Sequence, residues 1–307
     1  MFQIQGSLID LKQAKACGFA RLGALPLCAD REGLELDIQL GVAMNTSAPL
    51  SRHLAALRPG GMSAQEWQLR LELAACYRFF DYLGWTEMIF NHITLRVEGG
   101  APDNPHYLIN PFGLHYAFVT ATNLVKIDSR GKLIGESAYP VNPAGFIVHS
   151  VIHAARPDAH CIMHTHTTAG MAIACKAEGL RFDNFYTAML HGDVAYHEFE
   201  GITTSLDEGP RLTASLANKN VLILRNHGLL VCGHDVPATL QTMWTLQRGC
   251  EVQLASDSMR GDNHAIRPSV YEGILEQRLP MQMGERSGLL MFNGMLQKAG
   301  IRYEDLV

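Results

Sequence analysis

The sequence predicts an α/β protein in which short strands alternate with amphipathic helices. Apolar residues recur at three- and four-residue steps in several segments, which is the period of a helix with one buried face. Between these segments lie short runs of apolar or alternating residues, which are typical of strands. The expected helices span residues 64–83, 144–155, 169–177 and 236–255, and the expected strands span residues 93–97, 107–110, 124–128, 161–164 and 221–224.

The expected helix at 64–83 has the clearest boundaries. Ser63 and Glu66 have the spacing of a capping box, in which two side chains accept hydrogen bonds from free amides at the start of a helix. Gly84 follows the last periodic residue, where a left-handed residue commonly ends a helix. In the same way, Pro157 closes the expected helix at 144–155.

The chain is expected to form one main domain with an extension at each end. Residues 1–60 show no sustained apolar period and end in Arg58-Pro59-Gly60-Gly61, so they are interpreted as an N-terminal extension. The main domain is placed at 61–260. Residues 261–307 are expected to form a C-terminal helical tail that packs on this domain.

Composition and charge exclude several classes of function. Lys and Arg total 25 against 30 Asp and Glu, and no basic cluster lies on an expected helix, which disfavours nucleic-acid binding. No apolar run reaches the ~18 residues needed to cross a bilayer, and the first residues lack the pattern of a secretory signal. The seven cysteines are scattered, which indicates reduced thiols rather than disulfides. These features predict a soluble, cytoplasmic protein without a membrane partner.

The pair His164-Thr165-His166 at the end of an apolar strand is the strongest local signal for chemistry. Alternate residues of a strand point to the same side, so two imidazoles at this spacing can share one metal ion. A single histidine here would more readily be an ordinary polar residue at a strand end. Two histidines at this spacing favour a metal site.

His227 follows the most apolar strand, at 221–224, and lies beside Asn226 and Gly228. Three neutral imidazoles that leave a coordination position open are typical of a catalytic zinc site, where the metal polarises a carbonyl or activates water. We therefore expect His164, His166 and His227 to hold a divalent ion, with Zn²⁺ favoured over Mn²⁺, Fe²⁺ or Co²⁺. Three unrelated histidines among the 14 present are the alternative.

With these motifs in view, the sequence resembles the class II aldolase and adducin head-domain family, and its details resemble the adducin branch with its bacterial relatives. The resemblance runs from about residue 67 to residue 254. It is carried by Asn91-His92-Ile93-Thr94, Ile109-Asn110-Pro111-Phe112-Gly113, Ala155-Arg156-Pro157-Asp158, His164-Thr165-His166-Thr167 and Leu224-Arg225-Asn226-His227-Gly228-Leu229.

The resemblance implies a three-layer α/β/α domain around a largely antiparallel sheet, and a homo-oligomer, usually a homotetramer. It also implies that Asn91 and Gly113 match positions that help bind the anionic end of a substrate, through a side-chain amide and a backbone N–H. The alternative for both residues is turn chemistry, which Asn and Gly serve without any ligand.

One departure from the family pattern bears on activity. The aldolases carry a Pro-Ser-Ser-Glu run, whose hydroxyls bind phosphate and whose Glu ligates the metal and moves a proton. The aligned positions here are Asn142, Pro143, Ala144 and Gly145. A phosphorylated sugar would lose most of its partners, and Gly145 can act neither as a ligand nor as a base.

Residues that could supply the missing proton transfer are few. His149 lies four residues after Gly145, on the same face of the expected helix. Its alternative reading is a helix histidine bonded to a backbone carbonyl. Four other candidates fall between the two metal motifs: Tyr186, His191, Tyr196 and His197. For each of them, the alternative interpretation is simple packing or surface exposure.

Two classes of function follow from these observations. The first is a metal-dependent carbon–carbon lyase, of the aldolase or decarboxylase type, acting on a small non-phosphorylated carbonyl or carboxylate substrate. The second is a non-catalytic, adducin-like oligomerisation and binding module that retains a metal site. Gly145 favours the second, whereas the three retained histidines favour the first.

Overall fold

The computed structural model describes residues 51–202, 206–281 and 288–307. Of the N-terminal extension expected at 1–60, only the last ten residues lie inside these ranges. They include one short helix, α1 (Arg52–Ala56), which begins at the side-chain cap of Ser51.

The centre of the fold is a seven-stranded sheet with the order β3-β2-β1-β4-β7-β6-β5. Every neighbouring pair is antiparallel except β5 and β6, which run parallel. This agrees with the largely antiparallel sheet that the sequence implied. The strands are β1 (His92–Ala101), β2 (Asn104–Ile109), β3 (Val125–Ile127), β4 (Cys161–Thr165), β5 (Val194–His197), β6 (Val221–Leu224) and β7 (Gly228–Gly233).

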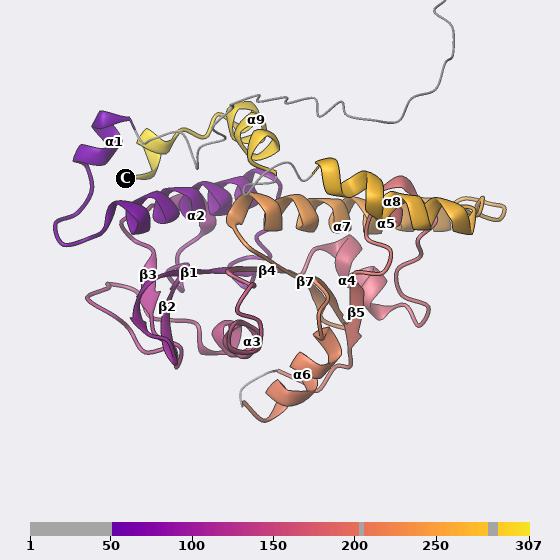
Figure 1. Ribbon diagram of the computed structural model, residues 1–307, viewed down its shortest axis with the longest axis horizontal. Helices are drawn as coiled ribbons and strands as arrows, with labels where there is room; N and C mark the ends of the chain where they lie inside the picture. Colours follow the sequence, from indigo (N-terminus) through magenta and orange to yellow (C-terminus); the bar gives the residue numbers. More distant parts are fainter. Residues whose placement is uncertain (1–50, 203–205, 282–287) are drawn as a thin grey trace, which may run out of the picture. The chain divides into compact units, whose positions relative to one another are not determined.

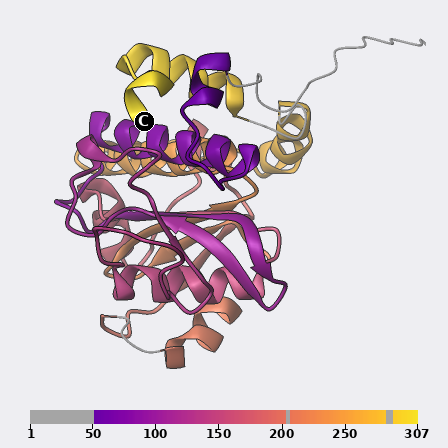
Figure 2. The same cartoon turned by 90° about the vertical axis from the view of Figure 1, so that its left-hand side faces the viewer.

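Helices cover both faces of this sheet, giving the three-layer α/β/α arrangement (Figure 1, Figure 2). One face carries α2 (Ala64–Tyr82), α4 (Thr168–Cys175) and α7 (Val236–Asp257), which contact β1, β4 and β7. The opposite face carries α3 (Pro143–Ala155) and α6 (Gly209–Leu216), which contact each other and strands β1, β5 and β6. The remaining described helices are α5 (Phe185–Ala188), α8 (Pro268–Met281) and α9 (Leu289–Ala299), with 3₁₀ turns at Tyr116–Phe118, Leu206–Glu208 and Tyr303–Leu306.

Strand β4 shows how the side chains divide between the two faces. Cys161 and Met163 join the large core under α2 and α7, whereas Ile162 joins the smaller core under α3 and α6. Since side chains alternate along a strand, His164 points toward the same face as Ile162. The same rule on β1 places Ile93 and Leu95 in the large core and turns His92 and Thr94 toward α3.

Helix α2 begins where the sequence predicted, but its cap differs in one respect. The Ser63 hydroxyl accepts a hydrogen bond from the Glu66 amide, as expected. The Glu66 carboxylate does not return to Ser63. It instead accepts bonds from Arg70 Nε at 2.9 Å and Lys126 Nζ at 2.6 Å, and these two cations hold its pKa below the usual value although burial acts to raise it.

Two strands and three short helices were absent from the sequence-based prediction: β5, β7, α1, α5 and α6. Strand β7 is the important omission, because it lies between β4 and β6 and joins the two predicted metal motifs. The C-terminal residues include α9, which packs on α7 and α2 and buries Phe292 completely. Within the described residues, no helix has the length and apolar character needed to cross a membrane.

Candidate functional site

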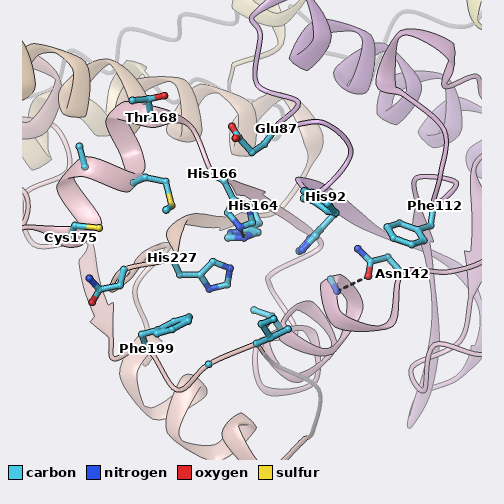
Figure 3. Close-up of a pocket in the computed structure, with 18 residues that line it drawn as sticks. Glu87, His92, Phe112, Asn142, His164, His166, Thr168, Cys175, Phe199 and His227 are labelled. Carbon is cyan, nitrogen blue, oxygen red and sulfur yellow. Dashed lines mark hydrogen bonds between the residues drawn. The ribbon is translucent and has the colours of Figure 1, made fainter.

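Three imidazoles meet where β4 ends and β6 turns into β7 (Figure 3). His164 is on β4, His166 follows the last residue of that strand, and His227 lies in the turn. One ring nitrogen from each residue can be chosen so that all three atoms lie within 4.8 Å of one another. The closest pair is His164 Nε2 and His166 Nε2, 2.6 Å apart.

The sheet order brings these residues together. Strand β7 pairs with β4 through Leu229 and Thr165, and with β6 through Gly228 and Leu224. The turn at 225–227 therefore lies beside the end of β4. A Cβ atom on Gly228 would stand 2.4 Å from the Thr165 carbonyl oxygen, so this close approach requires glycine.

Backbone groups orient the histidines of this triad. His164 Nδ1 lies 2.9 Å from the Leu229 carbonyl oxygen, which can only accept, so Nδ1 carries the proton. Burial, with the neighbouring histidines, holds the pKa of His164 well below its usual value, so the ring is neutral and Nε2 presents a lone pair to the other two rings. The His166 amide donates to Asn91 Oδ1 at 2.9 Å, which fixes the residue that follows β4.

The other two rings are also held neutral. Burial lowers the pKa of His166, and burial together with His166 lowers the pKa of His227 to about 4. Neutral imidazoles with one nitrogen free to coordinate are the form in which histidine binds zinc. A carbonyl that accepts the second ring N–H of a ligand is also a common outer contact at metal sites. The donor set therefore fits a divalent ion.

The triad opens into a cavity of about 900 Å³. Aromatic and aliphatic side chains form much of its wall, and the described residues that line it include no Lys or Arg. Glu87 is the carboxylate among them, and both it and Met88 have left-handed backbone conformations, with φ of 42° and 60°. Such conformations are uncommon outside glycine and cluster at functional sites. The principal lining residues are Glu87, Phe90, His92, Phe112, Asn142, Val148, Met171, Phe199 and Asn226.

A fourth histidine, His92, stands beside the triad on the cavity wall (Figure 3). It pairs with His164 across β1 and β4, and the two ring centroids are 5.0 Å apart. A Cβ atom on Gly145 would lie 2.5 Å from His92 Cδ2, so the ring occupies the space that a side chain at position 145 would need. Burial, with His166 and His227 adding to it, lowers the pKa of His92 to about 3.

Behind His92 lies a buried chain of hydrogen bonds. Thr94 Oγ1 lies 2.8 Å from His149 Nδ1 and 2.8 Å from His153 Nε2. His153 Nδ1 lies 2.7 Å from the Ala159 carbonyl oxygen. His149 Nε2 and His92 Nδ1 have no hydrogen-bond partner among the described residues.

The structure does not bring the remaining predicted site residues to the cavity lining. Asn91 uses both ends of its amide on backbone groups, since Nδ2 also donates to the Trp85 carbonyl at 2.8 Å. Gly113 has a left-handed φ of 94° in the loop after the lining residue Phe112. His149 is fully buried behind His92.

Of the four candidates between the metal motifs, Tyr196 and His191 lie in other surroundings. Tyr196 accepts a bond from the Leu180 amide and stacks under the Arg225 guanidinium. His191 stacks on Tyr271 with ring centroids 4.3 Å apart. These contacts are structural, and neither residue is part of the cavity wall described above.

Sequence reasoning missed His92 and Glu87. His92 was noted only as part of a motif. Its signal was present in the spacing of four residues. His92 and Thr94 lie two positions apart on β1, and His149 and His153 lie four positions apart on α3, so all four side chains can meet between one strand and one helix. Glu87 carries no comparable pattern, since it lies in an irregular loop.

One family model and several known proteins are similar to this chain. The family model described as Class II Aldolase and Adducin N-terminal domain matches residues 71–254. Alpha-adducin of Mus musculus is 43% identical over 227 residues, which are 72% of this chain and 30% of the adducin.

Solved structures give the same grouping. The crystal structure of an aldolase II superfamily protein from Pseudomonas syringae is 36% identical, with a TM-score of 0.71 over 78% of this chain and 94% of that one. An L-fuculose 1-phosphate aldolase from Glaciozyma antarctica PI12 is 27% identical, with a TM-score of 0.66 over 81% of this chain and 96% of that one.

Proposed function

Since the chain belongs to the class II aldolase and adducin family, we propose that it is a divalent-metal-dependent carbon–carbon lyase of the aldolase or decarboxylase type. His164, His166 and His227 hold the ion, with Zn²⁺ as the favoured metal. The substrate is a small, non-phosphorylated carbonyl or carboxylate compound.

One observation carries this proposal: the three imidazoles converge as neutral rings on a cavity wall. The Leu229 carbonyl fixes the His164 proton on Nδ1, so its Nε2 lone pair faces His166 and His227. A set of histidines that served only packing would not need one ring nitrogen from each of three residues within 4.8 Å of one another. When bound, the metal would stabilise the negative charge that develops on a carbonyl oxygen during carbon–carbon cleavage.

The wall of the cavity supports the substrate class. A phosphate ester is commonly held by Arg, Lys or several hydroxyl and amide donors, and the described lining supplies no Lys or Arg. Phe90, Phe112 and Phe199 provide aromatic surface instead. A volume of about 900 Å³ also accommodates a ligand larger than a three-carbon fragment.

Three residues complete the proposed machinery. Glu87 supplies a carboxylate at the cavity and is our candidate for the proton transfer that Gly145 cannot perform. Asn91 acts indirectly, by holding the backbone of His166. The backbone N–H of Gly113, which follows the lining residue Phe112, stays a candidate for binding the substrate.

The test is a turnover screen. Zinc-loaded wild type is assayed with short 2-oxo acids, hydroxy-2-oxo acids and hydroxyketones, and products are followed by mass spectrometry. We expect a metal-dependent cleavage that is abolished in His164→Ala and kept in His264→Ala, a change of an exposed histidine. Equal turnover in His164→Ala and wild type would reject the lyase.

A second candidate function is a non-catalytic binding module. It is favoured by Gly145 and by the 43% identity to alpha-adducin. A protein that retains zinc but is inactive on every compound of the screen would support this module.

We also propose a homotetramer in the cytosol. The support is family membership and a set of reduced cysteines, since Cys76, Cys161, Cys175, Cys232 and Cys250 are unpaired. Light scattering coupled to size-exclusion chromatography measures the mass directly, and a monomer at micromolar concentration would contradict the assembly.

A further inference from the structure

Two buried ring nitrogens next to the triad find no hydrogen-bond partner in the part of the chain that the structure describes. They are Nδ1 of His92 and Nε2 of His149, and they belong to adjacent rings whose centroids are 4.4 Å apart at an angle of 68°. A buried polar atom without a partner costs about 1–3 kcal/mol, so two of them side by side call for an explanation.

The direction of the hydrogen-bond chain behind these rings is fixed at its far end. The Ala159 carbonyl can only accept, so His153 Nδ1 carries the proton of that bond. Burial lowers the pKa of His153 to about 3, so the ring is neutral and Nε2 is unprotonated. The Thr94 hydroxyl must then donate to His153 Nε2.

The same logic sets the protonation of His149. The single Thr94 hydrogen is used on His153, so Thr94 Oγ1 accepts a hydrogen bond from His149 Nδ1. Burial keeps His149 neutral, because it places the pKa well below the usual value. Its second nitrogen, Nε2, therefore presents a lone pair beside the ring of His92.

That lone pair selects the tautomer of His92. A hydrogen bond from a protonated His92 Nδ1 to His149 Nε2 on the adjacent ring would satisfy both unpaired atoms at once. A proton on His92 Nε2 would instead leave both atoms as unpaired lone pairs in a buried space. In the first tautomer, His92 Nε2 is a pure acceptor, and it lies at the cavity wall beside Gly145.

We propose that His92 Nε2 is a fixed hydrogen-bond acceptor in the cavity, which binds a hydroxyl group of the ligand carried by the histidine triad. The inference rests on the metal site of the proposed function. Because an acceptor cannot pair with an oxyanion, His92 selects ligands that bear a neutral hydroxyl next to the metal-bound group. The substrate class is thereby narrowed to hydroxylated carbonyl or carboxylate compounds.

The tautomer is tested directly by nitrogen NMR on protein labelled with ¹⁵N-histidine, with and without zinc. The His92 signals are assigned by their loss in His92→Gln. We expect a protonated Nδ1 and an unprotonated Nε2 in wild type. In Thr94→Val, which breaks the chain at its centre, His92 should become a mixture of tautomers. A wild-type His92 with the proton on Nε2 would overturn the proposal.

The ligand preference is tested by calorimetry with two probes that differ by one hydroxyl, glycolohydroxamate and acetohydroxamate. On zinc-loaded wild type, we expect the hydroxylated probe to bind roughly 5- to 10-fold more tightly, which is the effect of one hydrogen bond. The preference should vanish in His92→Leu and return in part in His92→Gln, whose amide oxygen can accept. Equal binding of both probes to wild type would refute the role of His92.

Failure of the metal site and failure of this inference are distinguishable. Zinc content is measured on every variant, and we expect wild-type content in His92→Leu and His92→Gln because His92 is outside the ligand set. If wild type holds no zinc, the proposed function fails, while the tautomer measurement on the metal-free protein still decides the assignment of His92. Loss of zinc from His92→Gln would make His92 a ligand and would overturn the proposal.

Discussion

Replacing Gly145 by alanine should destabilise the protein, although the same change in the middle of a helix usually has the opposite effect. Gly145 lies in the first turn of α3, where alanine would gain about 1 kcal/mol from helix propensity. The added Cβ atom, however, would lie 2.5 Å from His92 Cδ2 and 2.9 Å from His92 Nε2. These contacts are roughly 1 Å shorter than carbon atoms normally allow.

The clash outweighs the gain in helix propensity because the ring has little room to move. His92 is 5% exposed, with His149 and His164 against its other sides. Forcing an extra carbon into a packed core costs about 2–3 kcal/mol at a contact this short. The expected net loss is about 1–2 kcal/mol, which corresponds to a fall in Tm of roughly 3–6 °C for a domain of this size.

Calorimetric or fluorescence-detected melting of the metal-free protein measures this change. Gly294→Ala in α9 is the matched control, because no described atom outside its own helix backbone lies within 4 Å of its added Cβ, and it should raise stability slightly. In a His92→Ala background, Gly145→Ala should also become stabilising. A rise in Tm for Gly145→Ala in the wild-type background would refute the reasoning.

The remaining predictions concern pH, zinc and proton transfer. The native pKa of His153 is about 3, below the usual 6.5, so the unfolded chain binds the extra proton and stability falls as pH drops below 6.5. In urea titrations from pH 7 to 4.5, His153→Gln should reduce the fall in the free energy of unfolding by about 1.4 kcal/mol per pH unit. A pH dependence equal to that of wild type would contradict a neutral His153 in the native state. Gly228→Ala should weaken zinc binding at least tenfold in competition with a chelator, because its Cβ would lie 2.4 Å from the Thr165 carbonyl; wild-type affinity would show that the turn can adjust. Glu87→Gln should lower turnover by ~10²-fold or more at unchanged zinc content, and full activity would remove Glu87 from the proton-transfer role.

The elements with strong periodicity were predictable. Residues 64–83 were expected to be helical, and α2 spans Ala64–Tyr82, because an apolar face and a Ser63 cap act locally. The strand at 221–224 was predicted with its correct limits because four consecutive apolar residues are bounded by polar ones. Strand β7 was missed. It also has four consecutive apolar residues, but these lie between two glycines, and the strand pairs with β4 and β6 on both sides, which is not encoded locally.

The residues of the candidate site also differ in whether local sequence or tertiary packing places them. The spacing of His164 and His166 is a local property of a strand end, so the sequence suggested their proximity. The position of His227 depends on β7, which was not predicted, so the sequence joined His227 to the pair only through the three-imidazole donor set that is typical of a zinc site. His92 and the chain through Thr94 depend on how α3 packs against β1, and that packing became visible only in three dimensions.

The central claim is that His164, His166 and His227 hold one divalent ion, and the metal content of the purified protein tests it most directly. Elemental analysis after zinc loading and removal of excess metal should find close to one zinc per chain in wild type and in His264→Ala. His166→Ala should lose most of it, because two imidazoles at a wide cavity bind zinc much more weakly than three. A His166→Ala protein as rich in zinc as wild type, or a wild type that holds none, would contradict the account.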